Sequence, residues 1–304
     1  MKYLLLAAAL FSFGIHRGMP HHSGIRSGKS IPTESGTRLP FYRITRDGSP
    51  DTSYLFGTLH LLESSFVDTL PAVRKALDRS NIVIGELVLD SGITGEALAG
   101  LFDAPPLDSL LTTAQYHTVS LAVKKYSPVP LMILTHAEPV IIYTMILEGM
   151  YGAKYPENQK TGVPMDLYFE REARKRGIPV MAFEQAGDQE QALDSIPLRE
   201  QTEDLVDLVE HPNATMRQMD TMLTDYRTGH ISEILEDPGF GTFSPKEMAT
   251  LLYNRNRKWM DTLPSILDRH NAFIAVGAGH LAGPQGLVDQ LRKRGYDVAW
   301  VKTN

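Results

Sequence analysis

One stretch of the sequence decides the fold: AFIAVGAGH, residues 272–280. Its first five residues are uncharged and apolar, which is typical of a strand that is buried on both faces of a parallel sheet. The glycines that follow end the strand, so His280 stands in the next loop. A second stretch of the same kind, SYLFGTLH, occupies residues 53–60. The pattern G-x-x-H therefore occurs twice, each time directly after a predicted strand.

Short apolar runs alternate with helix-like segments from residue 40 onward, which is the pattern of a sheet covered by helices. The runs at 41–45 and 53–56 flank the turn residues DGSP and predict an initial hairpin. Further strands are predicted at 81–85, 179–183, 272–276 and 296–301. The sequence thus predicts an α/β fold with a largely parallel central sheet.

The first residues have the composition of an export signal. Lys2 precedes a short apolar run, and small residues at positions 12 and 14 suit a cleavage site after Gly14. We therefore expect a signal peptide over residues 1–14, followed by a flexible linker rich in Gly, Ser, Pro and His over residues 15–39. The mature protein is expected in the periplasm or outside the cell.

The remainder, residues 40–304, is predicted to be one α/β domain with two helical insertions, at about 93–152 and 189–268. The first insertion contains an apolar run over residues 131–150. Glu148 falls inside this run, and a charge near a bilayer centre costs roughly 2.5–3.5 kcal/mol. We interpret the run as a buried helix and expect no stable membrane span in the mature chain.

The composition excludes several classes of protein. The 304 residues include no cysteine, so disulfide scaffolds, thiolate metal sites and thiol nucleophiles are ruled out. The formal net charge of −6 lacks the broad basic character of a nucleic-acid binder, and no nucleic-acid partner is expected. No pattern indicates an oligomeric state. A metal ion in this chain would have to be held by His, Asp or Glu.

Polar side chains follow four of the predicted strands: His60, Glu86, Glu184 and His280. The carboxyl ends of parallel strands meet at one edge of a sheet, where ligand sites gather. Two imidazoles and one or two carboxylates suit a divalent cation when no thiolate is available, so the two histidines and either or both of the glutamates are candidate metal ligands. A bound cation can polarise a carbonyl and activate water, so the pattern predicts hydrolysis of an amide or ester.

Other interpretations of these residues remain open. The turn over residues 277–279 could cradle a phosphate, although Ala282 replaces the third glycine of a nucleotide-binding loop. Either histidine alone could be a structural residue, or a general base in metal-free, esterase-like chemistry. Glu184 could be a ligand, a support for a ligand or a strand-end cap.

Three residues at predicted helices are also candidates. Asp166 could cap its helix, which is worth about 1 kcal/mol, or accept a hydrogen bond from a histidine N–H. Arg255 lies four residues before Trp259, so the two side chains could form a cation–π stack. Alternatively, Arg255 or Asn256 could stabilise a developing oxyanion.

Taken together, these residues resemble the TraB/PrgY/GumN family, whose animal relatives are the Tiki metalloproteases. The resemblance covers roughly residues 40–303. Its motifs are YLFGTLHL at 54–61, Glu86, GVPMD at 162–166, PVMAFE at 179–184, RNRKW at 255–259, VGAGHLAGPQGL at 276–287, and Gly295-Tyr296. The family resembles erythromycin-esterase-like and ChaN-like proteins, which have an α/β sheet with helical insertions.

The resemblance implies a metal-dependent peptidase acting on a peptide or protein substrate. It implies His60, Glu86 and His280 as ligands, with manganese or cobalt rather than zinc as the ion. Glu184 or Asp166 would then carry the proton; Gln185 stands where the family often has Thr. PrgY-like and ChaN-like relatives imply an alternative, a protein that binds a peptide or haem without turnover.

Overall fold

The structure is a computed structural model. It describes residues 38–47, 51–88, 102–156, 163–185, 188, 196–231 and 245–303. The predicted signal peptide over residues 1–14 and nearly all of the predicted linker over 15–39 lie outside the described residues, so both stay predictions.

A six-stranded sheet forms the centre of the fold. Its strands are β1 (Phe41–Thr45), β2 (Ser53–Thr58), β3 (Ile82–Gly85), β4 (Val180–Ala182), β5 (Ala272–Gly277) and β6 (Asp297–Trp300). They lie in the order β4-β3-β5-β2-β1-β6. The four strands from β4 to β2 are parallel, whereas β1 is antiparallel to both of its neighbours. The predicted α/β class with a largely parallel sheet is confirmed.

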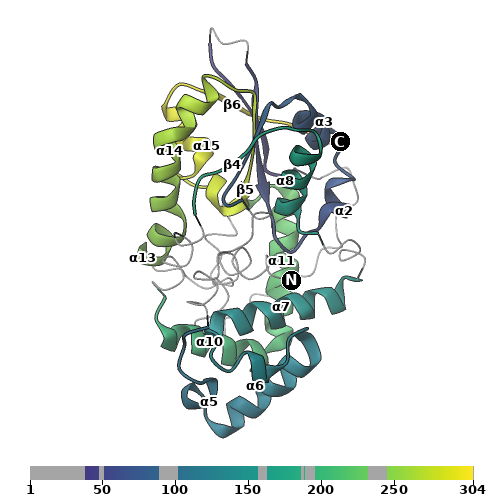
Figure 1. The fold of residues 1–304 in the computed structure, drawn as a ribbon, viewed down its shortest axis with the longest axis vertical. Coiled ribbons are helices and arrows are strands. Elements are labelled where there is room, and N and C mark those ends of the chain that lie inside the picture. Colours follow the sequence, from purple (N-terminus) through teal and green to yellow (C-terminus); the bar gives the residue numbers. More distant parts are fainter. Residues whose placement is uncertain are drawn as a thin grey trace.

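β5 is central because its whole length is apolar and can be buried on both faces. All six of its residues are buried. Phe273 and Ala275 point into one hydrophobic core, while Ile274 and Val276 point into the other. In Figure 1 the helices labelled α14 and α15 lie beside one face of the sheet, and α3 and α8 lie beside the other.

The helices divide into those that flank the sheet and those that form a separate layer. They are α2 (Ser64–Val67), α3 (Pro71–Arg79), α5 (Leu107–Leu110), α6 (Thr113–Tyr126), α7 (Pro139–Lys154), α8 (Met165–Lys175), α10 (Leu198–Glu210), α11 (Pro212–Thr228), α13 (Pro245–Met248), α14 (Asn254–Leu267) and α15 (Leu287–Lys293). Shorter turns are η2 (Leu131–Ile133), the π-helical η5 (Ala249–Tyr253) and η6 (Ala278–Leu281).

Local sequence explains where several helices begin and end. A proline occupies the first turn of α3, α7 and α11, where its missing N–H costs nothing. Thr112 and Gln115 form a reciprocal capping box at the start of α6. Gly229 ends α11 with a φ of 81°, a left-handed conformation that glycine adopts without strain.

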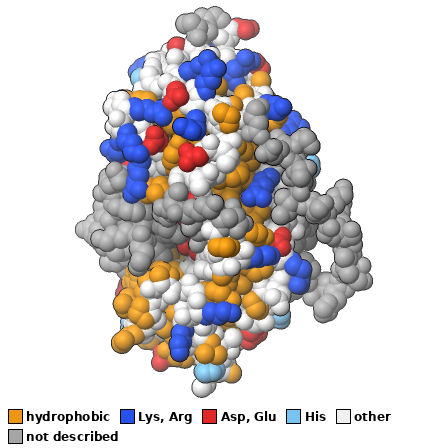
Figure 2. Space-filling model, turned by 90° about the vertical axis from the view of Figure 1, so that its right-hand side faces the viewer, with side chains coloured by type: hydrophobic (Ala, Val, Ile, Leu, Met, Phe, Trp, Pro, Cys, Tyr) orange, Lys and Arg blue, Asp and Glu red, His pale blue; other side chains and the backbone are white. Residues whose placement is uncertain are grey.

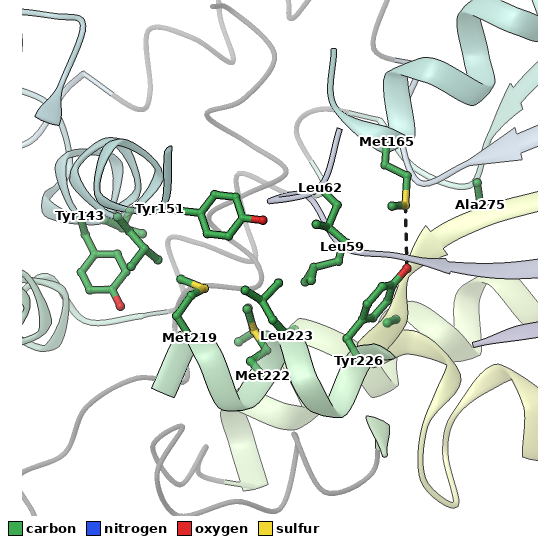
Figure 3. Close-up of a cluster of buried hydrophobic side chains, with 14 of the residues drawn as sticks. Leu59, Leu62, Tyr143, Tyr151, Met165, Met219, Met222, Leu223, Tyr226 and Ala275 are labelled. Atoms are coloured by element: carbon green, nitrogen blue, oxygen red, sulfur yellow. Dashed lines mark hydrogen bonds between the residues drawn. The ribbon is translucent and has the colours of Figure 1, made fainter. Parts of the chain in front are cut away.

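The helices α5, α6, α7 and α10 form a layer at the lower end of the molecule in Figure 1, and α11 runs between this layer and the sheet. Figure 3 shows how α11 joins the two parts: Met219 and Leu223 lie between Tyr151 of α7 and Leu59, which follows β2. All four side chains are buried in one apolar cluster. Through α11, the helical layer therefore packs against the end of β2.

The apolar run over residues 131–150 forms η2 and most of α7, and ten residues of α7 are buried. Within the described residues, no helix combines the length and the apolar character that a membrane span requires. Leu121 of α6 and Met132 and Ile133 of η2 remain exposed. Figure 2 shows apolar areas beside basic side chains at the lower end of the molecule, and acidic and basic side chains mixed at the opposite end.

Candidate active site

The register of the sheet brings the two G-x-x-H motifs together. In the parallel pairing of β2 with β5, Gly57 lies opposite Val276 and Thr58 lies opposite Gly277. The loops that follow β2 and β5 therefore leave the sheet side by side, at the carboxyl ends of the two strands. A Cβ on Gly57 would stand 3.0 Å from the Cα of Ala278, so glycine permits this close approach. His60 and His280, 220 residues apart in the sequence, therefore enter the site from neighbouring strands.

The two carboxylates enter the same site from the next two strands. Glu86 follows β3, which pairs with β5 on the side opposite β2. Glu184 follows β4, and its backbone N–H donates to the Glu86 carbonyl at 3.0 Å. Glu184 is buried, and the side chain of Glu86 is only 12% exposed. The order β4-β3-β5-β2 thus places the predicted polar residues in a row at the carboxyl ends of these four strands.

Glu86 faces His280 and stays ionised. Its Oε1 accepts the Gly277 N–H at 2.7 Å and lies 3.8 Å from Nε2 of His280. Its Oε2 accepts from Nη2 of Arg255 at 2.6 Å. Burial alone would raise the pKa of Glu86, but His280, Arg255 and His60, together with the Gly277 N–H, lower it to about 2. At neutral pH this carboxylate is an anion with a fixed orientation.

Asn256 fixes the orientation of the His280 ring. Its amide group donates to the carbonyl oxygens of His280 at 3.1 Å and Gln285 at 2.9 Å, so its Oδ1 is the atom 2.7 Å from Nδ1 of His280. Because Oδ1 can only accept, Nδ1 carries the ring proton and Nε2 carries the lone pair. Burial, with smaller effects from neighbouring charges, lowers the pKa of His280 to about 3. The ring is therefore neutral at pH 7.

Asp166 plays the corresponding part for His60. Its Oδ2 lies 2.6 Å from Nδ1 of His60, and a ring nitrogen that faces a carboxylate at this distance carries a proton. Burial would lower the pKa of His60, but the carboxylates of Asp166 and Glu86 outweigh it and raise this pKa above its usual value. The N-terminus of α8 has no side-chain cap, so Asp166 contacts the histidine and does not cap its helix.

Backbone bonds hold Asp166 in register with His60. Ser64 N–H donates to the Val163 carbonyl at 2.9 Å, and Met165 N–H donates to the Leu62 carbonyl at 3.1 Å. The loop after β2 and the start of α8 are therefore tied together on both sides of the contact. Next to this contact lies a cavity of about 30 Å³, which is lined by His60, Glu86, Asp166 and Glu170 among others. It has room for about one water molecule.

The N–H groups of Arg255 and Asn256 are largely committed within the protein. Arg255 donates Nε and Nη2 to Glu184, Nη2 also to Glu86, and Nη1 to the Leu251 carbonyl. Its guanidinium also lies 5.2 Å from the centre of the Trp259 ring, so the predicted cation–π contact is present. Both amide hydrogens of Asn256 are donated to carbonyls. These bonds favour orientation of Glu86 and His280 over stabilisation of an oxyanion.

Two further residues near the site have no motif in the sequence. Tyr226 of α11 is fully buried, and its hydroxyl donates at 2.8 Å to the carbonyl of Gly57, the first residue of the first G-x-x-H motif. Glu148 of α7 is partly buried, and burial raises its pKa to about 8 against the opposing effect of His60. For these two residues, the one signal in the sequence was the presence of Glu148 inside an apolar run.

The donor set suits a divalent cation in its chemistry. His280 presents a neutral Nε2 beside the ionised Glu86, and their 3.8 Å separation is shorter than two metal–ligand bonds of about 2.0–2.2 Å. The outer contacts with Asn256 and Asp166 are of the kind that orient metal-binding histidines. Among the described residues, however, no three His, Asp or Glu side chains stand at ligand distances around one point.

The chain is thus a mixed α/β protein with histidines and carboxylates gathered at adjacent strand ends. It belongs to the TraB/PrgY/gumN family, whose model matches residues 40–299. No solved structure matches it significantly.

Several curated relatives are named metalloproteases. Metalloprotease TIKI1 of Xenopus tropicalis is 26% identical over 302 residues, a match covering 81% of this chain and 59% of the relative. Metalloprotease TIKI2 of Danio rerio is 22% identical over 353 residues, covering 98% of this chain and 67% of the relative. Human Metalloprotease TIKI1 is 24% identical over 357 residues, covering 97% and 68%. The chain thus spans about three fifths to two thirds of these relatives.

Proposed function

We propose that the protein is a metal-dependent peptidase. The observation that carries the proposal is the meeting of His60, Glu86 and His280 at the ends of three adjacent strands, with each side chain oriented by a partner. Membership of a family that includes proteins named metalloproteases supports the same reaction class. The substrate would be a peptide or protein.

His60, Glu86 and His280 would hold the ion, for which we propose manganese or cobalt. A bound divalent cation supplies Lewis-acid polarisation of a carbonyl and lowers the pKa of water. Asn256 keeps Nε2 of His280 unprotonated, and Arg255 keeps Glu86 ionised, so both groups are ready to act as ligands.

We assign proton transfer to Asp166, whose carboxylate lies 2.6 Å from Nδ1 of His60 and lines the adjoining cavity. The adjoining cavity, with room for about one water molecule, offers a place from which a proton can be exchanged. Asp166 would thus combine two tasks, orientation of the ring and acceptance of a proton.

The first test measures metal content and cleavage in the same preparation. The full chain is purified without a His tag, analysed for metals, and incubated with a peptide library in EDTA and then with added Mn²⁺ or Co²⁺. We expect cleavage that EDTA abolishes and added metal restores. Full activity in chelator would refute the metal mechanism.

Variants connect the activity to the site. Glu86→Gln removes the carboxylate charge and should lower cleavage by at least about 100-fold, the scale on which loss of a fixed electrostatic group affects catalysis. Glu138→Gln is the matched control, because Glu138 is a partly buried glutamate at the start of α7 in the helical layer. Equal activity of the two variants would remove Glu86 from the site.

A metal-free hydrolase is the second candidate. The contact between His60 and Asp166 is the arrangement that prepares a histidine to act as a general base. This candidate predicts cleavage of esters in EDTA, and loss of that cleavage in His60→Gln. Absence of both metal and turnover would instead favour a protein that only binds a peptide or haem.

A further inference from the structure

Behind Glu86 lies a buried cluster of three side chains: Glu184, Arg255 and Trp259. Both oxygens of Glu184 accept from the guanidinium, Oε1 from Nε and Oε2 from Nη2, each at 2.7 Å. Oε1 also accepts from Nε1 of Trp259 at 2.9 Å. The side chains of Glu184 and Arg255 are 3% and 6% exposed. This cluster is therefore dry, and each charged group in it is paired.

These bonds fix the position of Glu184. A two-point pair between a carboxylate and a guanidinium defines the orientation of both groups. Removing one partner would leave the other charge unpaired inside the protein, which is costly.

The guanidinium links the two carboxylates. Nη2 of Arg255 donates to Oε2 of Glu184 at 2.7 Å and to Oε2 of Glu86 at 2.6 Å. With its Nε and one Nη2 hydrogen fixed by Glu184, the planar group can aim its remaining Nη2 hydrogen in only one direction. The hydrogen bond in that direction fixes the position of Oε2 of Glu86. The other oxygen, Oε1, then lies beside the Gly277 N–H and His280.

We propose that Glu184 is a positioning residue that fixes Arg255 and thereby holds Glu86 in its orientation toward His280. The proposal rests on the proposed function, in which Glu86 and His280 hold a divalent cation. Loss of Glu184 would therefore release Arg255 and, through it, the orientation of Glu86.

The test measures Mn²⁺ affinity directly, by calorimetry on the chelator-treated full chain. Glu184→Gln keeps the shape of the side chain and removes its charge. We expect Mn²⁺ to bind about 10- to 100-fold more weakly, the usual cost of removing a group that orients a ligand. Cleavage by this variant should return toward the wild-type level as Mn²⁺ is raised to saturation.

A double variant tests the path through Arg255. Arg255→Lys keeps the positive charge, but an ammonium group cannot reproduce the two-point pair with Glu184. If Glu184 acts only through Arg255, the Mn²⁺ affinity of the double variant Glu184→Gln/Arg255→Lys equals that of the weaker single variant. Losses that multiply would overturn the proposal, because they indicate independent roles.

The remaining outcomes separate this proposal from the proposed function. If the wild type neither binds Mn²⁺ nor cleaves peptides, the proposed function fails, and the positioning role fails with it. If the wild type binds Mn²⁺ and Glu184→Gln binds it equally well, the positioning role alone is overturned. Trp259→Phe provides a milder perturbation should Glu184→Gln not fold, since it removes one donor to Glu184 and should weaken Mn²⁺ binding to a smaller extent. Glu138→Gln should match the wild type.

Discussion

Replacing Glu148 by glutamine should change how the stability of the protein depends on pH. Glu148 lies on α7, a predominantly apolar helix with ten buried residues. Burial raises the pKa of its carboxyl from 4.5 to about 8, although His60 opposes the shift. The folded protein therefore favours the protonated, uncharged form of this side chain at neutral pH.

The sign of the effect follows from proton binding. Between pH 4.5 and pH 8 the folded chain binds more protons at Glu148 than the unfolded chain does, so the free energy of unfolding falls as pH rises through this window. A difference of about 3.5 pKa units corresponds to at most about 4.8 kcal/mol. Glu148 is partly exposed, and solvent screening reduces the effect, so we expect about 2 kcal/mol between pH 5 and pH 8.

Urea unfolding of the wild type and Glu148→Gln, both treated with chelator, measures this quantity at a series of pH values. Groups that titrate independently of Glu148 contribute equally to both proteins and cancel in the difference. Between pH 5 and pH 8, the free energy of unfolding of the variant should rise by about 2 kcal/mol relative to that of the wild type. Glu203→Gln, at a 61% exposed side chain of α10, should give a constant difference. Parallel curves for Glu148→Gln and the wild type would refute the reasoning.

Three other substitutions probe the framework of the site. Tyr226→Phe removes the hydroxyl that donates to the Gly57 carbonyl, and should lower the free energy of unfolding by about 1–2 kcal/mol in a urea titration; a loss below about 0.3 kcal/mol would contradict it. Gly57→Ala places a methyl group 2.8 Å from Cγ of Pro40, and should cost about 1–3 kcal/mol in the same titration and reduce cleavage. Asn256→Ala frees the ring of His280, and should weaken Mn²⁺ binding about 10- to 100-fold in calorimetry; unchanged affinity would show that another group orients the ring.

The sheet was predictable because its strands carry strong local patterns. The hairpin of β1 and β2 follows from two apolar runs around DGSP, and β5 follows from six residues without a charge. The run at 179–183 was predicted longer than the three residues of β4, which lies at the edge of the sheet and, among the described residues, pairs with β3 alone. Periodicity identifies a strand, but the extent of an edge strand depends on its single neighbour.

The gathering of polar residues at one edge was predictable in outline. Parallel strands bring their carboxyl ends together whatever their order, so His60, Glu86, Glu184 and His280 could be grouped before the order of the strands was known. Their partners could not be assigned in the same way. Whether Arg255 reaches Glu86, Glu184 or neither depends on how α14 is rotated against the sheet, and this is a property of tertiary packing.

Local patterns gave no signal for Tyr226, and for Glu148 they gave only its place inside an apolar run, without a role. Neither residue belongs to a recognisable chemical motif. The apolar pattern of a helix shows which face is buried, but it does not reveal which residues that face contacts. Tyr226 bonds to a carbonyl 169 residues away in the chain. Only the packing of the helical layer against the end of β2 shows that α7 and α11 bring polar groups to the site.

The central place of β5 also dictates when the molecule can be completed during synthesis. β2 and β3 do not pair with each other, because β5 separates them, and β5 begins at residue 272, after β1 to β4 have all been synthesised. Until the ribosome has released that segment, the emerging chain holds two sheet fragments with open inner edges, which invite pairing with other chains. Folding of the core is therefore a late, long-range event, and a nascent chain that stalls before residue 272 is expected to need protection from aggregation.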